Sequence, residues 1–220
     1  MTEILLHALI GAIVLLTCMP VHECAHAWAA YKLGDPTAKY QGRITLNPMA
    51  HLDLMGSICM IVSSVFGVGL GWAKPVQVNP NNFKNRKLGM GLSALAGPAS
   101  NFLMAFVIMI IYKLCYYLLD FQGAQYISII LYYMIVLNVG LAVFNFLPIP
   151  PLDGSKILLL VLPEKIYFKI MQYERYITLI LLVLIFANVL NRPIAFLQQL
   201  MLTALNFLTG FVDLIIGAIG

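Results

Sequence analysis

Residues 4–33 read ILLHALIGAIVLLTCMPVHECAHAWAAYKL, an apolar stretch that carries two histidines and a glutamate near its end. It exceeds the roughly 20 apolar residues that a helix needs to cross a bilayer. Residues four apart on a helix share a face, so His22 and His26 can reach one metal ion while Glu23 stands beside them. Ionisable groups are costly inside a membrane, and their presence here predicts a functional metal site.

The composition is that of a polytopic membrane protein. Of the 220 residues, 61% are apolar and 10% are charged, with a mean hydropathy of +0.91, whereas soluble domains carry about 25% charged residues. The net charge is +4, but the basic residues are scattered through loops and no nucleic-acid-binding motif accompanies them. The sequence therefore predicts the lipid bilayer as a partner and excludes nucleic acid.

Five apolar stretches are candidates for transmembrane helices: residues 4–33, 94–119, 125–147, 177–190 and 194–219. A sixth stretch, 52–70, is nearly as apolar but contains Asp53, several glycines and a serine pair. Seven of the thirteen Lys and Arg residues lie between positions 32 and 87, and four more lie between 156 and 175. Positive residues favour the cytosolic side, and both regions share that side if 52–70 re-enters the membrane without spanning it.

We therefore expect an all-α polytopic membrane protein with about five transmembrane helices and a re-entrant segment at 52–70. This topology puts the N-terminus outside, and His22 and His26 toward the cytosolic side of what we expect to be a prokaryotic cell membrane. Residues 1–155 would form a catalytic membrane core. Residues 156–220 would add C-terminal helices to the same membrane domain.

Two short stretches near the cytosolic rim have an extended pattern, residues 38–46 and residues 74–79. Together they predict a small hairpin-like β element. An exposed strand edge at Ile44 and Val76 would bind an extended substrate chain by β-addition. The alternative is a cytosolic loop that only packs against the protein.

A catalytic zinc site usually has three protein ligands and an open position for water, so the two histidines need a partner. Apart from Glu23, only Asp53 and Asp153 among the nine acidic residues lie in apolar surroundings. Asp153 follows a proline-rich break, PIPPLDG at 148–154, and broken backbone at membrane depth is tolerated only where it is buried in protein or lines a wet cavity. It is either a helix N-cap or the third ligand, and the HExxH motif favours the ligand.

His51 and Asp53 open the stretch that we expect to re-enter the membrane. They are candidates for contacts that support or regulate the metal site. A structural histidine that is satisfied by hydrogen bonds is the favoured alternative for His51.

Several motifs together resemble the site-2 protease family of intramembrane zinc metalloproteases. They are HECAH at 22–26, NPMAHLD at 47–53, WAKPVQVNP at 72–80, AGPASN at 96–101 and NFLPIPPLDG at 145–154. The resemblance covers residues 1–155, without an inserted PDZ or CBS domain, as in a minimal form of the family. It implies His22, His26 and Asp153 as ligands of one Zn2+ per chain, with Glu23 as general base.

Two side chains have expected roles in the chemistry. Glu23 would accept the proton of the attacking water and pass it to the leaving amine. Asn145 matches a family asparagine near the active site, where it would stabilise the oxyanion. The alternative for Asn145 is a hydrogen bond between helices, which asparagines often make in membranes.

The resemblance implies regulated intramembrane proteolysis, the hydrolysis of peptide bonds in or near transmembrane segments of membrane proteins. Without a recognition domain, selectivity would come from the substrate helix or from a regulatory membrane partner, and a homo-oligomer is a further candidate. The alternative function is a proton or metal-ion transporter that uses the same His, Glu and Asp groups. No inverted repeat supports it, and glutamate-dependent proteolysis would separate the two functions.

Overall fold

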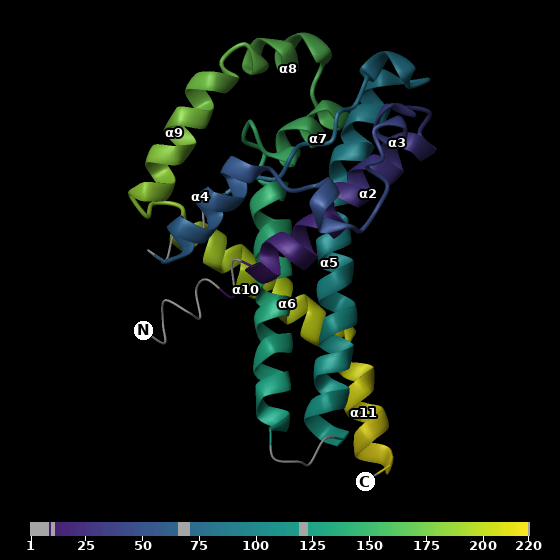
Figure 1. The fold of residues 1–220 in the computed structure, drawn as a ribbon, viewed down its shortest axis with the longest axis vertical. Coiled ribbons are helices and arrows are strands. Elements are labelled where there is room, and N and C mark those ends of the chain that lie inside the picture. The colour runs from purple at the N-terminus through teal and green to yellow at the C-terminus, as the bar shows by residue number, and fades with distance from the viewer. Residues whose placement is uncertain (1–8, 10–11, 66–70, 119–122, 220) are drawn as a thin grey trace.

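The computed structural model describes residues 9, 12–65, 71–118 and 123–219. Its longest elements are α5 (Arg86–Leu118) and α6 (Ala124–Phe146), which run side by side as a hairpin in the lower half of Figure 1. The apolar core lies between these helices and the C-terminal helices. Its buried residues are Ala105, Ile108, Met109, Ile135, Val139, Val143 and Leu205.

The C-terminal part of the chain packs on this hairpin. α10 (Asn191–Leu208) crosses α6 and α5 and contributes Leu205 to the core. α11 (Gly210–Ile219) lies beside the far end of α5, where the chain ends (Figure 1).

The upper half of the molecule is built around α2 (Met19–Lys32), which lies across α5 (Figure 1). A π-helical turn at Val14–Cys18 precedes α2. Pro20 has no N–H to donate to that turn, which accounts for the irregular start of the helix. α7 (Asp153–Val161) also packs on α5, so α5 is the wall that α2 and α7 share.

Shorter elements surround these helices: α3 (Thr37–Tyr40), α4 (Leu54–Val65), α8 (Glu164–Met171), α9 (Glu174–Phe186), and 3-10 turns at Pro48–Ala50 and Pro80–Asn82. α8 and α9 form an arch at the upper left of Figure 1.

Among the described residues, three helices are long and apolar enough to cross a membrane: Arg86–Leu118, Ala124–Phe146 and Asn191–Ala218. The expected first span, 4–33, begins in residues outside the described part. The stretch expected to span at 177–190 is helical only as far as Phe186, where α9 with its 13 residues ends. The stretch expected to re-enter, 52–70, contains α4 with 12 residues, and its end lies outside the described part.

The expected hairpin at the cytosolic rim does not form in the part of the chain that the structure describes. Thr37–Tyr40 is helical, and the isolated antiparallel bridge of Leu52 with Ala73 lies outside both stretches. A side-chain hydrogen bond from Nε2 of Gln41 to Oε1 of Gln77, 2.8 Å long, joins the two stretches. The physical reason is competition for backbone donors. The N–H of Val76 goes to Glu23 and the N–H of Asn79 goes to Asp35, so neither is free to build a strand ladder.

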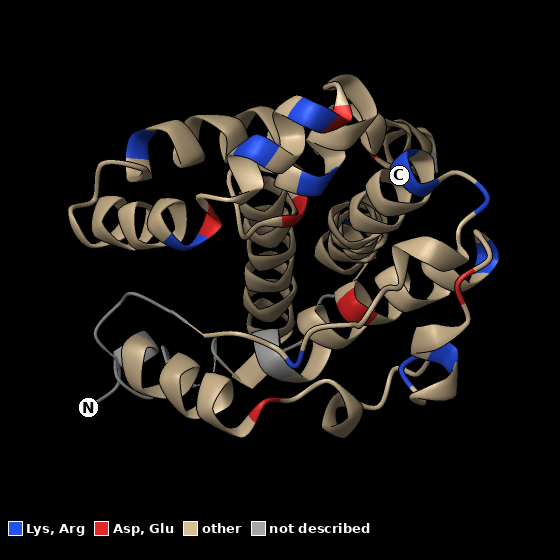
Figure 2. Cartoon of the chain, turned by 90° about the horizontal axis from the view of Figure 1, so that it is seen from above, with Lys and Arg blue, Asp and Glu red and all other residues tan. Residues whose placement is uncertain are grey.

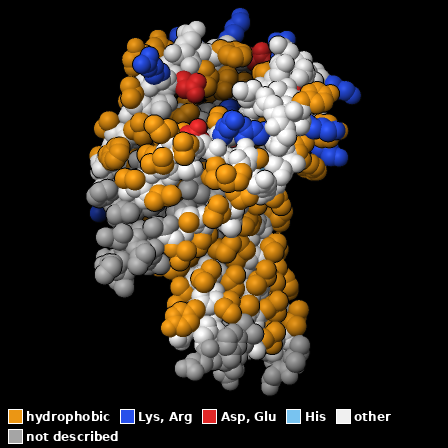
Figure 3. Space-filling view, in the orientation of Figure 1, with side chains coloured by type: hydrophobic (Ala, Val, Ile, Leu, Met, Phe, Trp, Pro, Cys, Tyr) orange, Lys and Arg blue, Asp and Glu red, His pale blue; other side chains and the backbone are white. Residues whose placement is uncertain are grey.

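Charge is concentrated at one end of the molecule. In the face shown in Figure 3, Lys, Arg, Asp and Glu gather over the upper elements, and the lower half shows hydrophobic side chains. Figure 2 looks down on this charged end, where the backbone positions of Lys and Arg are coloured on several helices and loops. Such an arrangement suits a protein whose lower half lies in lipid and whose upper end meets water.

Candidate metal centre and active site

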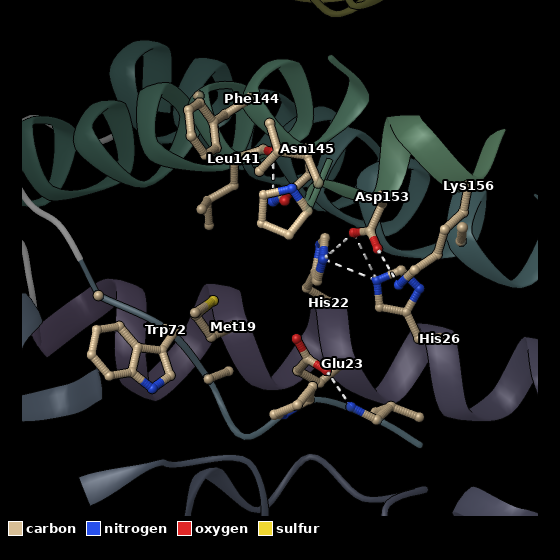
Figure 4. A pocket seen from close by; sticks show the side chains of 18 of the residues that line it. Met19, His22, Glu23, His26, Trp72, Leu141, Phe144, Asn145, Asp153 and Lys156 are labelled. Atoms are coloured by element: carbon tan, nitrogen blue, oxygen red, sulfur yellow. Dashed lines mark hydrogen bonds and ion pairs between the residues drawn. The ribbon is translucent and has the colours of Figure 1, made fainter. Parts of the chain in front are cut away.

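Three predicted ligand side chains converge between α2 and the start of α7 (Figure 4). The Nε2 atoms of His22 and His26 are 3.0 Å apart, and each lies 3.1 Å from Oδ2 of Asp153. Both imidazoles are buried, with 4% and 8% of the residue exposed. The helix supplies the two histidines one turn apart, and the proline-rich break brings Asp153 to them from 127 residues away.

The hydrogen bonds of His26 show which nitrogen of its imidazole ring carries the hydrogen. Its Nδ1 lies 2.7 Å from the backbone oxygen of Ser93 on α5. A carbonyl oxygen can only accept, so Nδ1 carries the hydrogen, and the Nε2 of a neutral ring presents a lone pair to His22 and Asp153. The acceptor atoms of His26 and Asp153 therefore face Nε2 of His22 in a buried site, an arrangement that fits a cation between the three atoms.

The spacing of these atoms suits zinc. Zinc with four tetrahedral bonds of about 2.0–2.1 Å holds its ligand atoms about 3.3 Å apart. The distances of 3.0–3.1 Å between the three atoms are close to that edge length. Two imidazoles and one carboxylate also form a donor set that is common in catalytic zinc sites.

Gly97 on α5 lets the helix approach the two imidazoles. A Cβ added at this position would lie 2.2 Å from Nε2 of His26 and 2.6 Å from Cε1 of His22. Gly154 has a similar role behind Asp153, because a Cβ there would lie 2.2 Å from the carbonyl oxygen of Leu147. The two glycines account for close packing on both sides of the candidate metal centre.

Glu23 stands beside the histidines and lines a cavity of about 850 Å³ with them. One of its oxygens, Oε2, accepts a hydrogen bond from the backbone N–H of Val76 at 3.3 Å. The extended segment 71–78 thus lies along the cavity next to the expected base (Figure 4). The rest of the lining is mostly apolar and comes from α2, α4, α5, α6, α7, α9 and α10.

Asn145 also lines the cavity, near the end of α6. Its Nδ2 donates to the carbonyl oxygen of Leu141 at 3.1 Å. An amide nitrogen carries two hydrogens, so this bond uses one of its two donors. Figure 4 places Asn145 across the cavity from Glu23.

The other predicted site residues have different surroundings. Nε2 of His51 lies 2.7 Å from the carbonyl oxygen of Thr45, and the residue is buried. Asp53 caps α4 by accepting the N–H of Gly56 at 2.8 Å. Of the two residues expected to contact a substrate strand, Val76 is part of the cavity lining and Ile44 is half-buried. Among described residues, the lining does not include His51, Asp53 or Ile44.

Two neighbours of the metal ligands were not singled out by the sequence. Nζ of Lys156 lies 3.7 Å from Oδ1 of Asp153, and its position three residues later on one helix face is a signal that was available. Asn101, the last residue of the AGPASN motif at 96–101, places its Nδ2 3.3 Å from Nδ1 of His22.

Comparisons with known proteins agree with this geometry. Residues 116–187 match the family model described as Peptidase family M50. A Bacillus subtilis protein named "Putative zinc metalloprotease YwhC" is 41% identical over 179 residues, which is 78% of each chain. The chain belongs to peptidase family M50, the site-2 protease family, and is a zinc metalloprotease.

More distant relatives carry a corresponding name, zinc metalloprotease Rip2. The Mycolicibacterium smegmatis protein is 28% identical over 61% of this chain and 50% of its own length. The Mycobacterium tuberculosis protein is 26% identical over 80% of this chain and 66% of its own length. No solved structure matches the chain.

Proposed function

We propose that this protein hydrolyses peptide bonds in or near transmembrane segments of membrane proteins, and so performs regulated intramembrane proteolysis. The observation that carries the proposal is the convergence of His22, His26 and Asp153 at one cavity with Glu23, in a molecule whose other half is apolar. A catalytic cavity above helices that fit a bilayer suits a substrate that arrives through the membrane.

In this proposal His22, His26 and Asp153 hold one zinc ion per chain. When bound, zinc supplies Lewis acidity to water and to the scissile carbonyl group. Glu23 takes the proton of the attacking water and delivers it to the leaving amine. The Val76 N–H holds one oxygen of Glu23, which keeps the carboxylate turned along the cavity.

Asn145 has the position to hold the substrate. It lies across the cavity from Glu23, and its second N–H would donate to the oxygen of the scissile carbonyl. The extended segment 71–78 is the candidate wall for an unwound substrate chain. Because Val76 already donates its N–H to Glu23, its side chain and carbonyl oxygen remain for substrate contact. A substrate contact at Ile44 stays a prediction from the sequence.

The length of α5 supports a position of the site near one surface of the membrane. Gly97 touches the histidines, and Tyr117 lies 20 residues further along the helix, a rise of about 30 Å. That rise equals the hydrocarbon thickness of a typical bilayer. Exposed Tyr116, Tyr117 and Tyr126 form an aromatic belt at that far end, of the kind that marks a membrane interface. The metal centre then lies near the opposite interface.

We place that interface on the cytosolic side of a prokaryotic cell membrane, because the Lys- and Arg-rich segments lie at the same end of the molecule. The first helix, with its N-terminus outside, would add a membrane segment to the three long helices, and α4 and the α9 region would enter the membrane without crossing it. Selectivity would come from the substrate helix or from a regulatory or identical membrane partner.

The test uses wild-type protein, Glu23→Gln and Glu164→Gln, each purified in detergent and incubated with a transmembrane-segment fusion, with and without a zinc chelator. Glu164 is an exposed glutamate on α8 and serves as the matched control. We expect cleavage by wild type and Glu164→Gln only, abolished by the chelator, with about one zinc per chain in all three proteins. Absence of zinc from the wild type, or cleavage by Glu23→Gln at the wild-type rate, would overturn the proposal.

A further inference from the structure

Asn101 is a fully buried amide on α5, one helical turn beyond Gly97. Its Nδ2 lies 3.3 Å from Nδ1 of His22. Its Oδ1 is buried and has no hydrogen-bond partner in the described part of the chain. An unpaired buried oxygen next to a candidate metal ligand calls for a physical explanation, because such groups are normally satisfied.

The chemistry of His22 provides one. A neutral imidazole that offers its Nε2 lone pair to a metal carries its hydrogen on Nδ1, and that N–H needs an acceptor. An amide NH2 group cannot accept it. The oxygen and nitrogen of an amide have nearly the same shape, so their placement depends on the hydrogen-bond network. A half-turn of the Asn101 amide brings the unpaired Oδ1 to the position where it accepts from Nδ1 of His22.

His26 shows the same pattern on the same helix. Its Nδ1 lies 2.7 Å from the carbonyl oxygen of Ser93, which can only accept. Ser93, Gly97 and Asn101 are spaced by four residues and therefore lie along one face of α5. With Asn101 turned, each histidine has an oxygen acceptor on this face and presents Nε2 to the shared site.

We propose that Asn101 is a positioning residue of the metal centre, whose amide oxygen holds His22 in the ring form that binds zinc through Nε2. The inference rests on the proposed function, because it takes His22 as a zinc ligand. Asn101 touches neither substrate nor metal and acts through the imidazole alone.

Asn138 on α6 offers a matched control. It is also fully buried, and its Oδ1 has no hydrogen-bond partner among the described residues. Its Nδ2 donates to the carbonyl oxygen of Met134 at 2.8 Å and to Sγ of Cys18 at 3.3 Å, and it contacts no predicted metal ligand. A loss of packing or of a buried amide affects both asparagines, whereas a loss of support for the metal affects Asn101 only.

The experiment measures zinc affinity by competition with a chromophoric chelator for the full chain in detergent. The proteins are wild type, Asn101→Leu, Asn101→Asp and Asn138→Leu. We expect Asn101→Leu to lose about 10–100-fold in affinity, the usual effect of removing a partner of a metal-bound histidine. Asn101→Asp keeps an oxygen acceptor and should bind at least as tightly as the wild type. Asn138→Leu should bind like the wild type.

A second measurement is the visible spectrum of the cobalt-substituted proteins, which reports the geometry of the ligands. The bands should shift in Asn101→Leu and stay in place in Asn101→Asp and Asn138→Leu. If Asn101→Leu does not fold, Asn101→Asp decides alone: undiminished affinity supports the inference, and a loss of about tenfold or more overturns it. Wild-type affinity in a folded Asn101→Leu also overturns it.

These outcomes are distinct from a failure of the proposed function. If the wild type binds no zinc, the proposed function itself fails. If the wild type binds zinc and the leucine and aspartate variants match it, the zinc site stands and only the role of Asn101 fails.

Discussion

The candidate metal centre depends on a residue without a side chain as well as on its predicted ligands. Gly97 has no side chain, and this absence lets α5 lie against both imidazoles. The sequence marks the position within AGPASN at 96–101, but no property of a glycine in a helix reveals which side chains press against it. Only the contact with His22 and His26 explains it.

We predict that Gly97→Ala disrupts the metal centre. The added methyl group would lie 2.2 Å from Nε2 of His26, so the imidazoles or the helix must shift. Alanine favours a helix over glycine by about 1 kcal/mol, so the change should not weaken α5 itself. Zinc content and cleavage of a transmembrane substrate should both fall at least about tenfold.

The control for this variant is Gly210→Ala in α11, where an added Cβ meets nothing within 4 Å. It should keep its zinc and its activity. Equal zinc affinity in Gly97→Ala and the wild type would contradict the role that we assign to this contact.

Asp35 holds together the loop that follows α2. It is fully buried and accepts hydrogen bonds from the backbone and hydroxyl of Thr37, the backbone of Asn79 at 2.7 Å and the amide of Asn82 at 2.6 Å. Burial alone disfavours the charged carboxylate, but these donors outweigh it and hold the pKa of Asp35 below its usual value.

We predict that Asp35→Asn destabilises the protein by about 1–3 kcal/mol at neutral pH, because the amide cannot accept the same bonds. A lowered pKa in the folded state stabilises the protein above the unfolded-state pKa of about 3.9, and this contribution is lost as the pH falls through the folded-state value. The difference in melting temperature from the wild type should therefore shrink below about pH 4. Thermal unfolding of both proteins and of the exposed control Glu164→Gln across pH measures it, and a constant difference would contradict the prediction.

At the scale of elements, α5 connects the candidate metal centre with the contacts that hold the C-terminal helix α11. Near its start, one face supports both histidines through Ser93, Gly97 and Asn101. Near its end, the buried Lys113 pairs with Asp213 of α11, with Nζ 2.5 Å from Oδ2. Asp213 also accepts from the hydroxyl of Tyr117 at 3.3 Å. The helix thus carries the site at one end and an anchor for the C-terminal helix at the other.

We predict that Asp213→Asn lowers stability without affecting the metal centre. Its loss leaves the buried ammonium group of Lys113 without a counter-charge, at a cost of about 1–3 kcal/mol in the free energy of unfolding. Lys113 lies 16 residues beyond Gly97, about 24 Å along the helix, so zinc binding should not change.

Unfolding in a denaturing detergent series, together with zinc content, measures both effects. The double variant Lys113→Met with Asp213→Asn should recover part of the stability, because it removes the stranded charge. A single variant as stable as the wild type would show that the pair contributes nothing to anchoring α11.

At the scale of the whole molecule, the separation of charge from apolar surface defines an orientation. The charged residues in view gather over the end that holds the metal centre, and the hydrophobic surface covers the other half (Figure 3). In the proposed orientation, the bilayer would surround the α5–α6 hairpin, and the cavity would lie at the boundary between lipid and water. Water would then reach the site of hydrolysis without exposing the helices below.

We predict opposite exposure for the two ends of the molecule. Gln125→Cys, at the start of α6, should react with a membrane-impermeant maleimide in right-side-out vesicles. Lys165→Cys, on α8 at the charged end, should react only in inverted vesicles, because positive segments stay in the cytosol. The parent chain with its four free cysteines gives the background. Labelling of both positions from one side would reject this topology.

Much of this organisation could be predicted from the sequence because it depends on local patterns. The apolar stretches at 94–119 and 125–147 correspond to α5 and α6, since long apolar runs specify membrane helices directly. The prediction of a β element was wrong for the described residues, because the side chains of Glu23 and Asp35 accept hydrogen bonds from the backbone donors that strands would use. The alternation of residues along a stretch does not show that a side chain from another element will accept hydrogen bonds from its backbone N–H groups.

The sequence by itself determined the membrane class of the protein and the pair of histidines on one helical face, since both follow from composition and helical period. The approach of Asp153 to them was an expectation until the fold placed it 3.1 Å from both rings. Only the tertiary structure decided that α5 supports the two histidines, and that segment 71–78 lies beside Glu23. These contacts join residues far apart in the chain, and packing, rather than local propensity, selects them.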